Sequence, residues 1–168
     1  RVSQLAMLAR MEKALSKTRT DEDVIAAVLN HLGLHDAYTV SLAHLHVGPG
    51  GSPHSYEFAA LWSGDQMRPV SAQAIPLSAN ALTAFWLDDP DALVCVADAF
   101  DDPRVPDELR EQAAQDGWRA AVLMPLRSAG EWQGLFTLTW REARALTVEE
   151  RFLFPRVAES LGSAVASR

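Results

Sequence analysis

Apolar residues recur at two different spacings along this chain, and the change of spacing divides it into helical ends and a strand-rich middle. Near each end, apolar residues stand three or four positions apart, which is typical of amphipathic helices. The first stripe comprises Leu5, Leu8, Ala9, Met11 and Leu15, and the last comprises Phe154, Ala158, Leu161 and Val165. Between the ends lie short apolar runs separated by turn residues, the pattern expected of β-strands.

Capping signals predict where the helices near the chain ends begin. Thr20, with Asp23 three residues later, indicates the start of a second helix after the N-terminal one. Thr147 and Glu150 form a complete capping box ahead of the C-terminal helix. We therefore expect an N-terminal helix within residues 1–17 and a C-terminal helix within residues 147–168.

Six segments have the composition of β-strands, namely 38–47, 56–62, 70–75, 93–97, 120–126 and 132–140. The segment 120–126 is apolar at every position, so neither of its faces suits contact with water. Gly134 in the last segment predicts a bulge or a close backbone approach. Short connections between consecutive strands favour antiparallel pairing. The sequence predicts an α+β fold with a central antiparallel sheet of about five or six strands.

Two shorter helices are expected between the strands. Ser78 marks the start of one that extends to Leu87. Pro106 fits the first position of the other, because the acidic residues that follow favour the positive end of a helix. Gly117 is the expected C-terminal cap of this second helix.

The charge and composition argue against several classes of partner. The net charge of −7 disfavours a nucleic acid or an anionic membrane as the main partner. The sequence contains no run of about 18 apolar residues, so it predicts no membrane span. The one cysteine, Cys95, lies in an apolar run and fits a reducing, cytoplasmic compartment. Because the chain begins with Arg1 and not with methionine, we expect it to be a piece of a longer protein.

Asp98 is the residue best suited to contact a ligand. It directly follows the apolar run 93–97, which puts a carboxylate at a strand end, and Phe100 comes two residues later. A carboxylate there can accept hydrogen bonds from a ligand. It can equally accept them from backbone N–H groups of the following turn. The sequence leaves both interpretations open.

A series of short motifs resembles, in its order, the second half of a GAF domain, a small-molecule sensor module. The motifs are Asp98, Asp102-Pro103-Arg104, Gly117-Trp118-Arg119, Met124-Pro125-Leu126, and Gly130 with Gly134. The resemblance implies one GAF-like domain over residues 1–168. In this domain the terminal helices lie on one sheet face, and short helices and loops cover a ligand pocket on the other.

The same resemblance implies a sensory or regulatory role within a larger signalling protein, such as a histidine kinase of a two-component system. The domain itself is not expected to be an enzyme. Its terminal helices, through residues such as Leu8 and Leu161, are expected to form a homodimer and to pass a signal to an output domain. The alternative is a dimerisation or interaction module whose pocket has collapsed and holds no ligand.

The resemblance also suggests which residues bind the ligand. Asp98 aligns with a carboxylate that contacts the chromophore in phytochrome-type relatives, and Trp86 and Phe100 lie in segments that cover the ligand. The full expected set is Asp98, Phe100, Phe85, Trp86, Arg104 and Trp118. In the competing interpretation, the aromatic residues pack the core and the arginine is solvated.

Covalent and metal-dependent chemistry is not expected. Bilin-binding relatives use a cysteine in or near the helix after the aspartate, but the helix over 107–116 contains none and Cys95 precedes Asp98. All five histidines precede Ser78, so the expected pocket offers no haem ligand. No paired acid and base or complete metal set supports catalysis. We therefore expect a small ligand, of unknown identity, to bind non-covalently.

Overall fold

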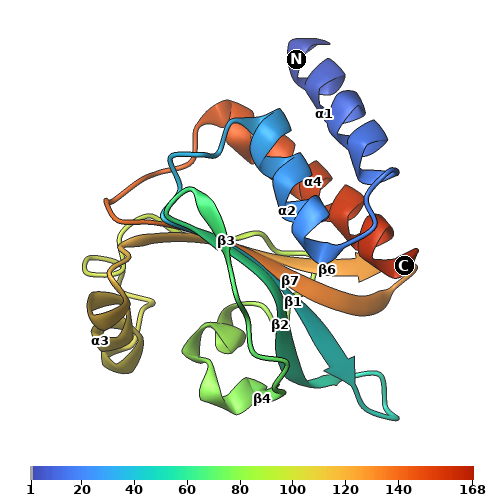
Figure 1. Ribbon diagram of the computed structural model, residues 1–168. Helices are drawn as coiled ribbons and strands as arrows, with labels where there is room; N and C mark the ends of the chain where they lie inside the picture. Colours follow the sequence, from blue (N-terminus) through green and yellow to red (C-terminus); the bar gives the residue numbers. More distant parts are fainter. Residues whose placement is uncertain (1) are drawn as a thin grey trace.

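The computed structural model describes residues 2–168 and consists of an antiparallel sheet with helices on both faces (Figure 1). Six strands follow the order β3-β2-β1-β7-β6-β5, and a seventh, β4, pairs with β2 off this path. The strands are β1 (Thr39–Val47), β2 (Pro53–Ser63), β3 (Gln66–Arg68), β4 (Ile75–Pro76), β5 (Val94–Val96), β6 (Ala120–Ser128) and β7 (Glu131–Trp140). The helices are α1 (Val2–Leu15), α2 (Asp21–Leu32), α3 (Asp107–Asp116) and α4 (Val148–Ala166), with 3₁₀ turns η1 (Leu77–Ala79) and η2 (Ala81–Phe85). The predicted α+β class is confirmed.

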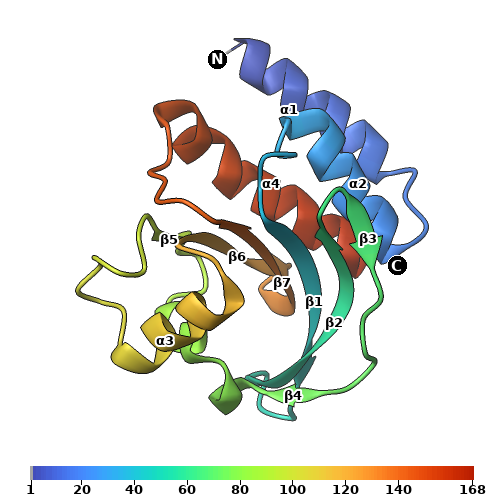
Figure 2. The same cartoon turned by 60° about the vertical axis from the view of Figure 1, so that its left-hand side comes forward.

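The helices divide between the two faces of the sheet as expected. Figures 1 and 2 show α1, α2 and α4 on one side, and α3 with the 3₁₀ turns on the other. The larger core lies between the sheet and the first group. Alternate residues of the central strands enter this core, including Val40 and Leu42 of β1 and Phe136 and Leu138 of β7, all with no exposed surface. The residues between them face the opposite side.

Both predicted capping boxes are present. The Thr20 hydroxyl accepts from the backbone N–H of Asp23, whose side chain accepts in return from the N–H of Thr20. Thr147 and Glu150 make the same reciprocal pair at the start of α4. These contacts satisfy N–H groups that a helix cannot pair internally, which explains why the two starts are readable from sequence.

The roles expected for Leu8 and Leu161 in a dimer are wrong. Leu8 is 7% exposed and Leu161 is 0% exposed, because both side chains pack into the core between the helices and the sheet. Of the apolar residues in the α1 stripe, Leu5 and Ala9 are open to solvent, and Leu5 is 50% exposed.

The strand expected at 70–75 is also wrong. Gly64 and Asp65 both adopt positive φ, 61° and 67°, which is the geometry of a two-residue hairpin turn. Pairing with β2 therefore resumes at once after Asp65, and β3 covers only three residues. The chain then runs without regular structure from 69 to 74 before β4 pairs with β2 again.

The helix expected over 78–87 is replaced by two 3₁₀ turns. The side chain of Asn80, and not that of Ser78, caps the second turn by accepting from the N–H of Leu82 at 2.9 Å. The helix α3 forms as predicted and ends at Gly117, whose φ is 88°. Pro106 occupies its N-cap and not its first helical position.

Gly134 confirms the predicted close backbone approach. A Cβ atom at this position would lie less than 3.0 Å from the carbonyl oxygen of Ala43 on the neighbouring strand β1. On the other side, β6 shifts its register against β7 between Leu126 and Arg127. The glycine thus lets β7 pack between β1 and β6 at a point where the pairing of β6 with β7 is irregular.

Candidate functional site

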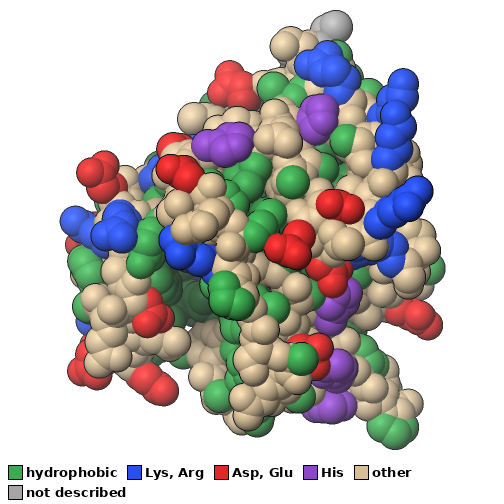
Figure 3. All heavy atoms as spheres, in the orientation of Figure 1, with side chains coloured by type: hydrophobic (Ala, Val, Ile, Leu, Met, Phe, Trp, Pro, Cys, Tyr) green, Lys and Arg blue, Asp and Glu red, His purple; other side chains and the backbone are tan. Residues whose placement is uncertain are grey.

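The sheet face opposite the terminal helices is hollowed by a cavity of about 490 Å³. Strands β1, β2, β6 and β7 supply its floor. The irregular segment 69–74, Ile75 of β4 and η2 contribute to its sides, and the end of α3 closes it from another side. Figure 3 shows this recess beside the lobe that carries α3, with hydrophobic side chains inside it. The cavity lies where the resemblance places a ligand pocket.

Four hydroxyl groups form a polar strip across the cavity floor. Thr39 and Ser41 come from β1, and Thr139 and Thr137 stand directly opposite them on β7. The hydroxyls of Thr39 and Thr139 bond to each other at 2.5 Å. Within residues 2–168, the hydroxyls of Ser41 and Thr137 have no hydrogen-bond partner. This second pair is therefore free to bond to a ligand.

The surroundings of this strip are mostly apolar and aromatic, and the polar side chains of Ser71, Gln73, Asn80 and Gln112 also belong to the lining. Tyr56 and Phe58 pack edge to face with ring centroids 5.5 Å apart. Leu123 of β6 and Leu135 of β7 flank the strip and are 2% and 4% exposed. Such a lining, mostly apolar with a few placed polar groups, is typical of small-molecule sites.

The cavity carries little charge. Among the described residues that line it, the only charged side chain is that of Asp116, at the exposed end of α3. The backbone carbonyl of Asp116 accepts a hydrogen bond from the hydroxyl of Tyr38 at 3.2 Å. None of these lining residues is an arginine, lysine, histidine or cysteine. The lining therefore offers neither a thiol nor an imidazole for catalysis.

Of the six residues expected to bind a ligand, Trp118 lines the cavity, at 8% exposed. Asp98 lies outside its lining, where its carboxylate pairs with Arg119 through bonds of 2.5 and 3.2 Å. It also accepts from the backbone N–H of Phe100 at 3.0 Å. The hydrogen bond from Arg119, with that from the N–H of Phe100, lowers the pKa of Asp98. Asp98 therefore accepts a hydrogen bond from the backbone of the following turn, which is the second of the two interpretations that the sequence leaves open. It also forms an ion pair with Arg119.

Phe100, Arg104 and Phe85 form contacts near this turn and do not line the cavity. Phe100 is 42% exposed, and the guanidinium of Arg119 lies 5.1 Å from its ring centroid. Arg104 pairs with Asp102 at 2.7 Å, which lowers the pKa of that carboxyl, and it also donates to the carbonyl oxygen of Cys95. Its guanidinium lies 5.7 Å from the ring of Phe85.

Trp86 is a core residue of the cavity-side face. It has no exposed surface and packs edge to face against Trp132, with ring centroids 5.2 Å apart. Its indole N–H has no hydrogen-bond partner within residues 2–168. The aromatic packing that the sequence left as an alternative is what the structure has at this position.

Two kinds of feature are absent from residues 2–168. No helix there is both long enough and apolar enough to cross a membrane. No three histidine, cysteine, aspartate or glutamate side chains come close enough together to hold a metal ion. His44 instead bonds to Asp21 at 3.2 Å, and Cys95 is half-buried in β5, where burial raises the pKa of its thiol.

Comparison with known proteins yields the fold. No family model matches the sequence, and no curated protein matches it. Among solved structures, the phycocyanobilin-bound GAF domain of a cyanobacterial phytochrome superposes with a TM-score of 0.72 at 17% identity, covering 98% of this chain and 94% of that one. The GAF domain of a two-component sensor histidine kinase from Bacillus halodurans gives 0.65 at 11% identity, covering 89% and 96%. Free methionine-R-sulfoxide reductase from Neisseria meningitidis, in complex with its substrate, gives 0.66 at 15% identity, covering 98% and 89%. The chain therefore has the fold of GAF domains, as its motifs suggest.

Proposed function

We propose that this chain is the sensory domain of a larger signalling protein and that it binds a small molecule non-covalently in the cavity over β1 and β7. The observation that carries the proposal is the cavity itself. Its volume of about 490 Å³ falls in the usual range for ligand sites, about 300–1,000 Å³. The fold likeness to GAF domains of a phytochrome and a sensor kinase is consistent with this role.

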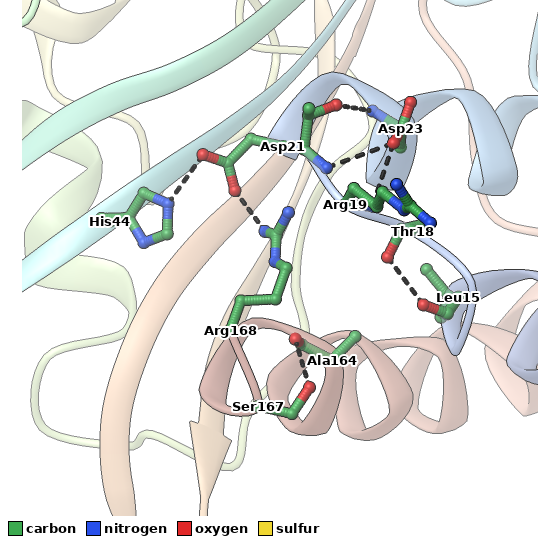
Figure 4. Close-up of polar contacts among 10 residues, drawn as sticks. Leu15, Thr18, Arg19, Asp21, Asp23, His44, Ala164, Ser167 and Arg168 are labelled. Atoms are coloured by element: carbon green, nitrogen blue, oxygen red, sulfur yellow. Dashed lines mark hydrogen bonds and ion pairs between the residues drawn. The ribbon is translucent and has the colours of Figure 1, made fainter.

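A relay from the cavity to the terminal helices has a physical basis in β1. Ser41 of this strand faces the cavity, whereas His44 faces the helices and bonds to Asp21 at the start of α2. Asp21 also pairs with Arg168, just after the end of α4 (Figure 4). One carboxylate thus connects the strand to both helices. A ligand can shift these helices only if it binds two packings of the strand with different affinity.

The remaining parts of the proposal concern partners. A groove lies between α1 and α4, lined by side chains such as Leu15, Glu12 and Arg156. A second copy of the chain would use this face to form a homodimer, together with Leu5, which is exposed one helical turn before the groove residue Leu8. In the parent protein, which we propose to be cytoplasmic, α4 would continue toward an output domain.

Two other functions compete with this proposal. The reductase among the fold neighbours shows that catalysis can occur on this architecture. Here the one cysteine, Cys95, lies outside the cavity lining, and we propose that the domain is not itself an enzyme. The second competitor is a ligand-free interaction module, which is favoured by the aromatic pair Trp86 and Trp132 filling part of the same sheet face.

A thermal-shift panel with a pocket-filling variant tests the sensor proposal. The panel includes free amino acids, small organic acids, aromatic amides, cyclic nucleotides, haem and biliverdin. A ligand present at about a hundred times its Kd stabilises the folded state by about 2.7 kcal/mol, which is readily seen as a raised Tm. Thr137→Trp fills the cavity from the middle of β7, and Gln133→Trp is the matched control, because Gln133 is half-buried on the same strand but outside the lining.

The expected result is a compound that raises the Tm of the wild-type protein and of Gln133→Trp but not that of Thr137→Trp. A panel without effect on the wild-type protein would favour the interaction module. A compound that stabilises both variants equally would place the binding site somewhere else.

A further inference from the structure

We propose that the cavity selects an uncharged, largely apolar molecule that presents one carbonyl, amide or hydroxyl group to Ser41 and Thr137. This inference rests on the proposed ligand-binding function and adds the chemical class of the ligand. It follows from three features of the lining, namely its lack of cations, its pair of free hydroxyls and its aromatic walls.

The charge of the lining disfavours anions. A carboxylate or phosphate taken out of water needs a cation or several donors to offset its desolvation, and no cationic side chain is among the described lining residues. The guanidinium groups of Arg119 and Arg104 already form ion pairs, with Asp98 and Asp102 respectively. A cationic ligand is also disfavoured, because Asp116, the one carboxylate among the described lining residues, is exposed at the end of α3 and offers no buried counter-charge. A neutral ligand avoids both penalties.

The free hydroxyls supply the polar recognition. Ser41 is only 9% exposed, yet its hydroxyl has no partner within residues 2–168. It stands directly across from Thr137, as Thr39 does from Thr139, and the hydroxyls of Thr39 and Thr139 bond to each other at 2.5 Å. A hydroxyl can donate and accept. One carbonyl or hydroxyl oxygen of a ligand can therefore bond to both side chains of the free pair.

The walls determine what the rest of the ligand must be. Phe58, Leu123, Leu135 and Trp118 surround the free pair with apolar surface. Burying apolar area against such walls is favourable at about 25 cal/mol per Å². Additional charged groups on a ligand would meet these walls without a partner, so the ligand carries its polar group at one end of an apolar body.

Four probes of nearly the same shape test this assignment, namely benzamide, benzoate, benzylammonium and toluene. Each is titrated into the isotope-labelled domain at pH 7 by NMR, with the methyl signals of Leu123 and Leu135 reporting binding inside the cavity. We expect benzamide to bind roughly two- to tenfold tighter than toluene, the factor that one net hydrogen bond contributes. We expect benzoate and benzylammonium to bind more weakly than toluene.

Two variants test whether the preference for benzamide over toluene comes from the hydroxyls of Ser41 and Thr137. The double variant Ser41→Ala with Thr137→Val should bind benzamide and toluene equally. Ser55→Ala is the matched control, because Ser55 is also 9% exposed and lies on β2 outside the cavity lining. It should keep the wild-type preference. The order of the four probes on the wild-type protein decides the inference even if the double variant does not fold.

The outcomes separate this inference from the proposal on which it rests. Binding of benzoate or benzylammonium as tight as that of benzamide overturns the neutral-ligand assignment and leaves the cavity as a binding site. Equal binding of benzamide and toluene to the wild-type protein overturns the role of the hydroxyls. If none of the four probes shifts the signals of Leu123 and Leu135, both the inference and the cavity-based function fail.

Discussion

Replacing Gly162 by alanine should loosen the contact between α4 and the sheet. Gly162 is buried in α4, and a Cβ atom at this position would lie 3.0 Å from the carbonyl carbon of Arg127, 3.1 Å from its nitrogen, and closer still to its oxygen. All three neighbours are backbone atoms of β6, which at Arg127 is paired with Trp132 of β7. Arg127 also stands where β6 shifts its register against β7. The backbone there cannot give way as a flexible side chain would.

Two effects of opposite sign set the magnitude. Alanine favours a helix interior over glycine by about 0.5–1 kcal/mol. Overpacking a buried contact typically costs about 1–3 kcal/mol, occasionally more. Because the obstacle is backbone, we place the cost in the upper part of that range and expect Gly162→Ala to lose about 1–2 kcal/mol in free energy of unfolding. For a domain of this size, such a loss lowers the Tm by about 2–8 °C.

Urea unfolding and thermal melts of Gly162→Ala measure this loss, with Gly50→Ala as the matched control. Gly50 lies in the loop between β1 and β2, and no atom lies within 4 Å of a Cβ atom built there. The same substitution at Gly50 should therefore leave stability unchanged or raise it slightly by restricting the unfolded chain. A Gly162→Ala protein as stable as the wild type would refute the close approach of α4 to β6.

Three further predictions address a carboxylate, a cap and the proposed dimer. Burial alone would raise the pKa of Glu150, but hydrogen bonds from Arg144 and from a backbone N–H lower it below its ordinary 4.5. Its stabilising effect is therefore complete above about pH 4.5 and lost as the pH falls through the folded-state pKa, and urea midpoints between pH 7 and 3 should fall less steeply in Glu150→Gln. Thr20→Ala removes the side-chain acceptor at the start of α2 and should cost about 1 kcal/mol at an unchanged urea m-value; an unchanged urea midpoint would show that the cap contributes nothing. Leu5→Asp should convert the proposed dimer to a folded monomer by light scattering, because Leu5 is 50% exposed and outside the core, and a dimer mass that persists would exclude this face.

The parts of the fold that could be predicted are those whose determinants are local. The starts of α2 and α4 follow from side chains three residues apart, and the end of α3 follows from Gly117 in the left-handed region. The segments 70–75 and 78–87 could not be predicted in the same way. The first depends on the tight turn at 64–65, which returns the chain to β2 at Gln66, before residue 70. In the second, Asn80 caps a new turn two residues after Ser78, and the segment forms 3₁₀ turns in place of one α-helix.

The site was harder to predict because its residues meet only through the sheet. Asp98 and Arg119 are 21 positions apart and come together because β5 and β6 pair. The carboxylate of Asp98 then bonds to Arg119 of the same chain. Thr39 and Thr139 are 100 positions apart. Hydroxyl residues alternating with apolar ones are visible within 39–43 and within 135–139, and each stripe indicates one polar strand face. Their adjacency depends on the pairing of β1 with β7, which a single sequence does not contain.

The position of β1 explains why binding and signalling would depend on the same strand. Ser41 faces the cavity and Leu42, the next residue, has no exposed surface in the core beneath the terminal helices. The strand is paired with β2 and β7, so it moves as part of the sheet and not residue by residue. Because protein cores are packed as densely as crystals, a displacement of Ser41 changes the space available to the helices through Leu42. The relay we propose therefore depends on β1 and on the contact of His44 with Asp21, and not on the ion pair of Asp98.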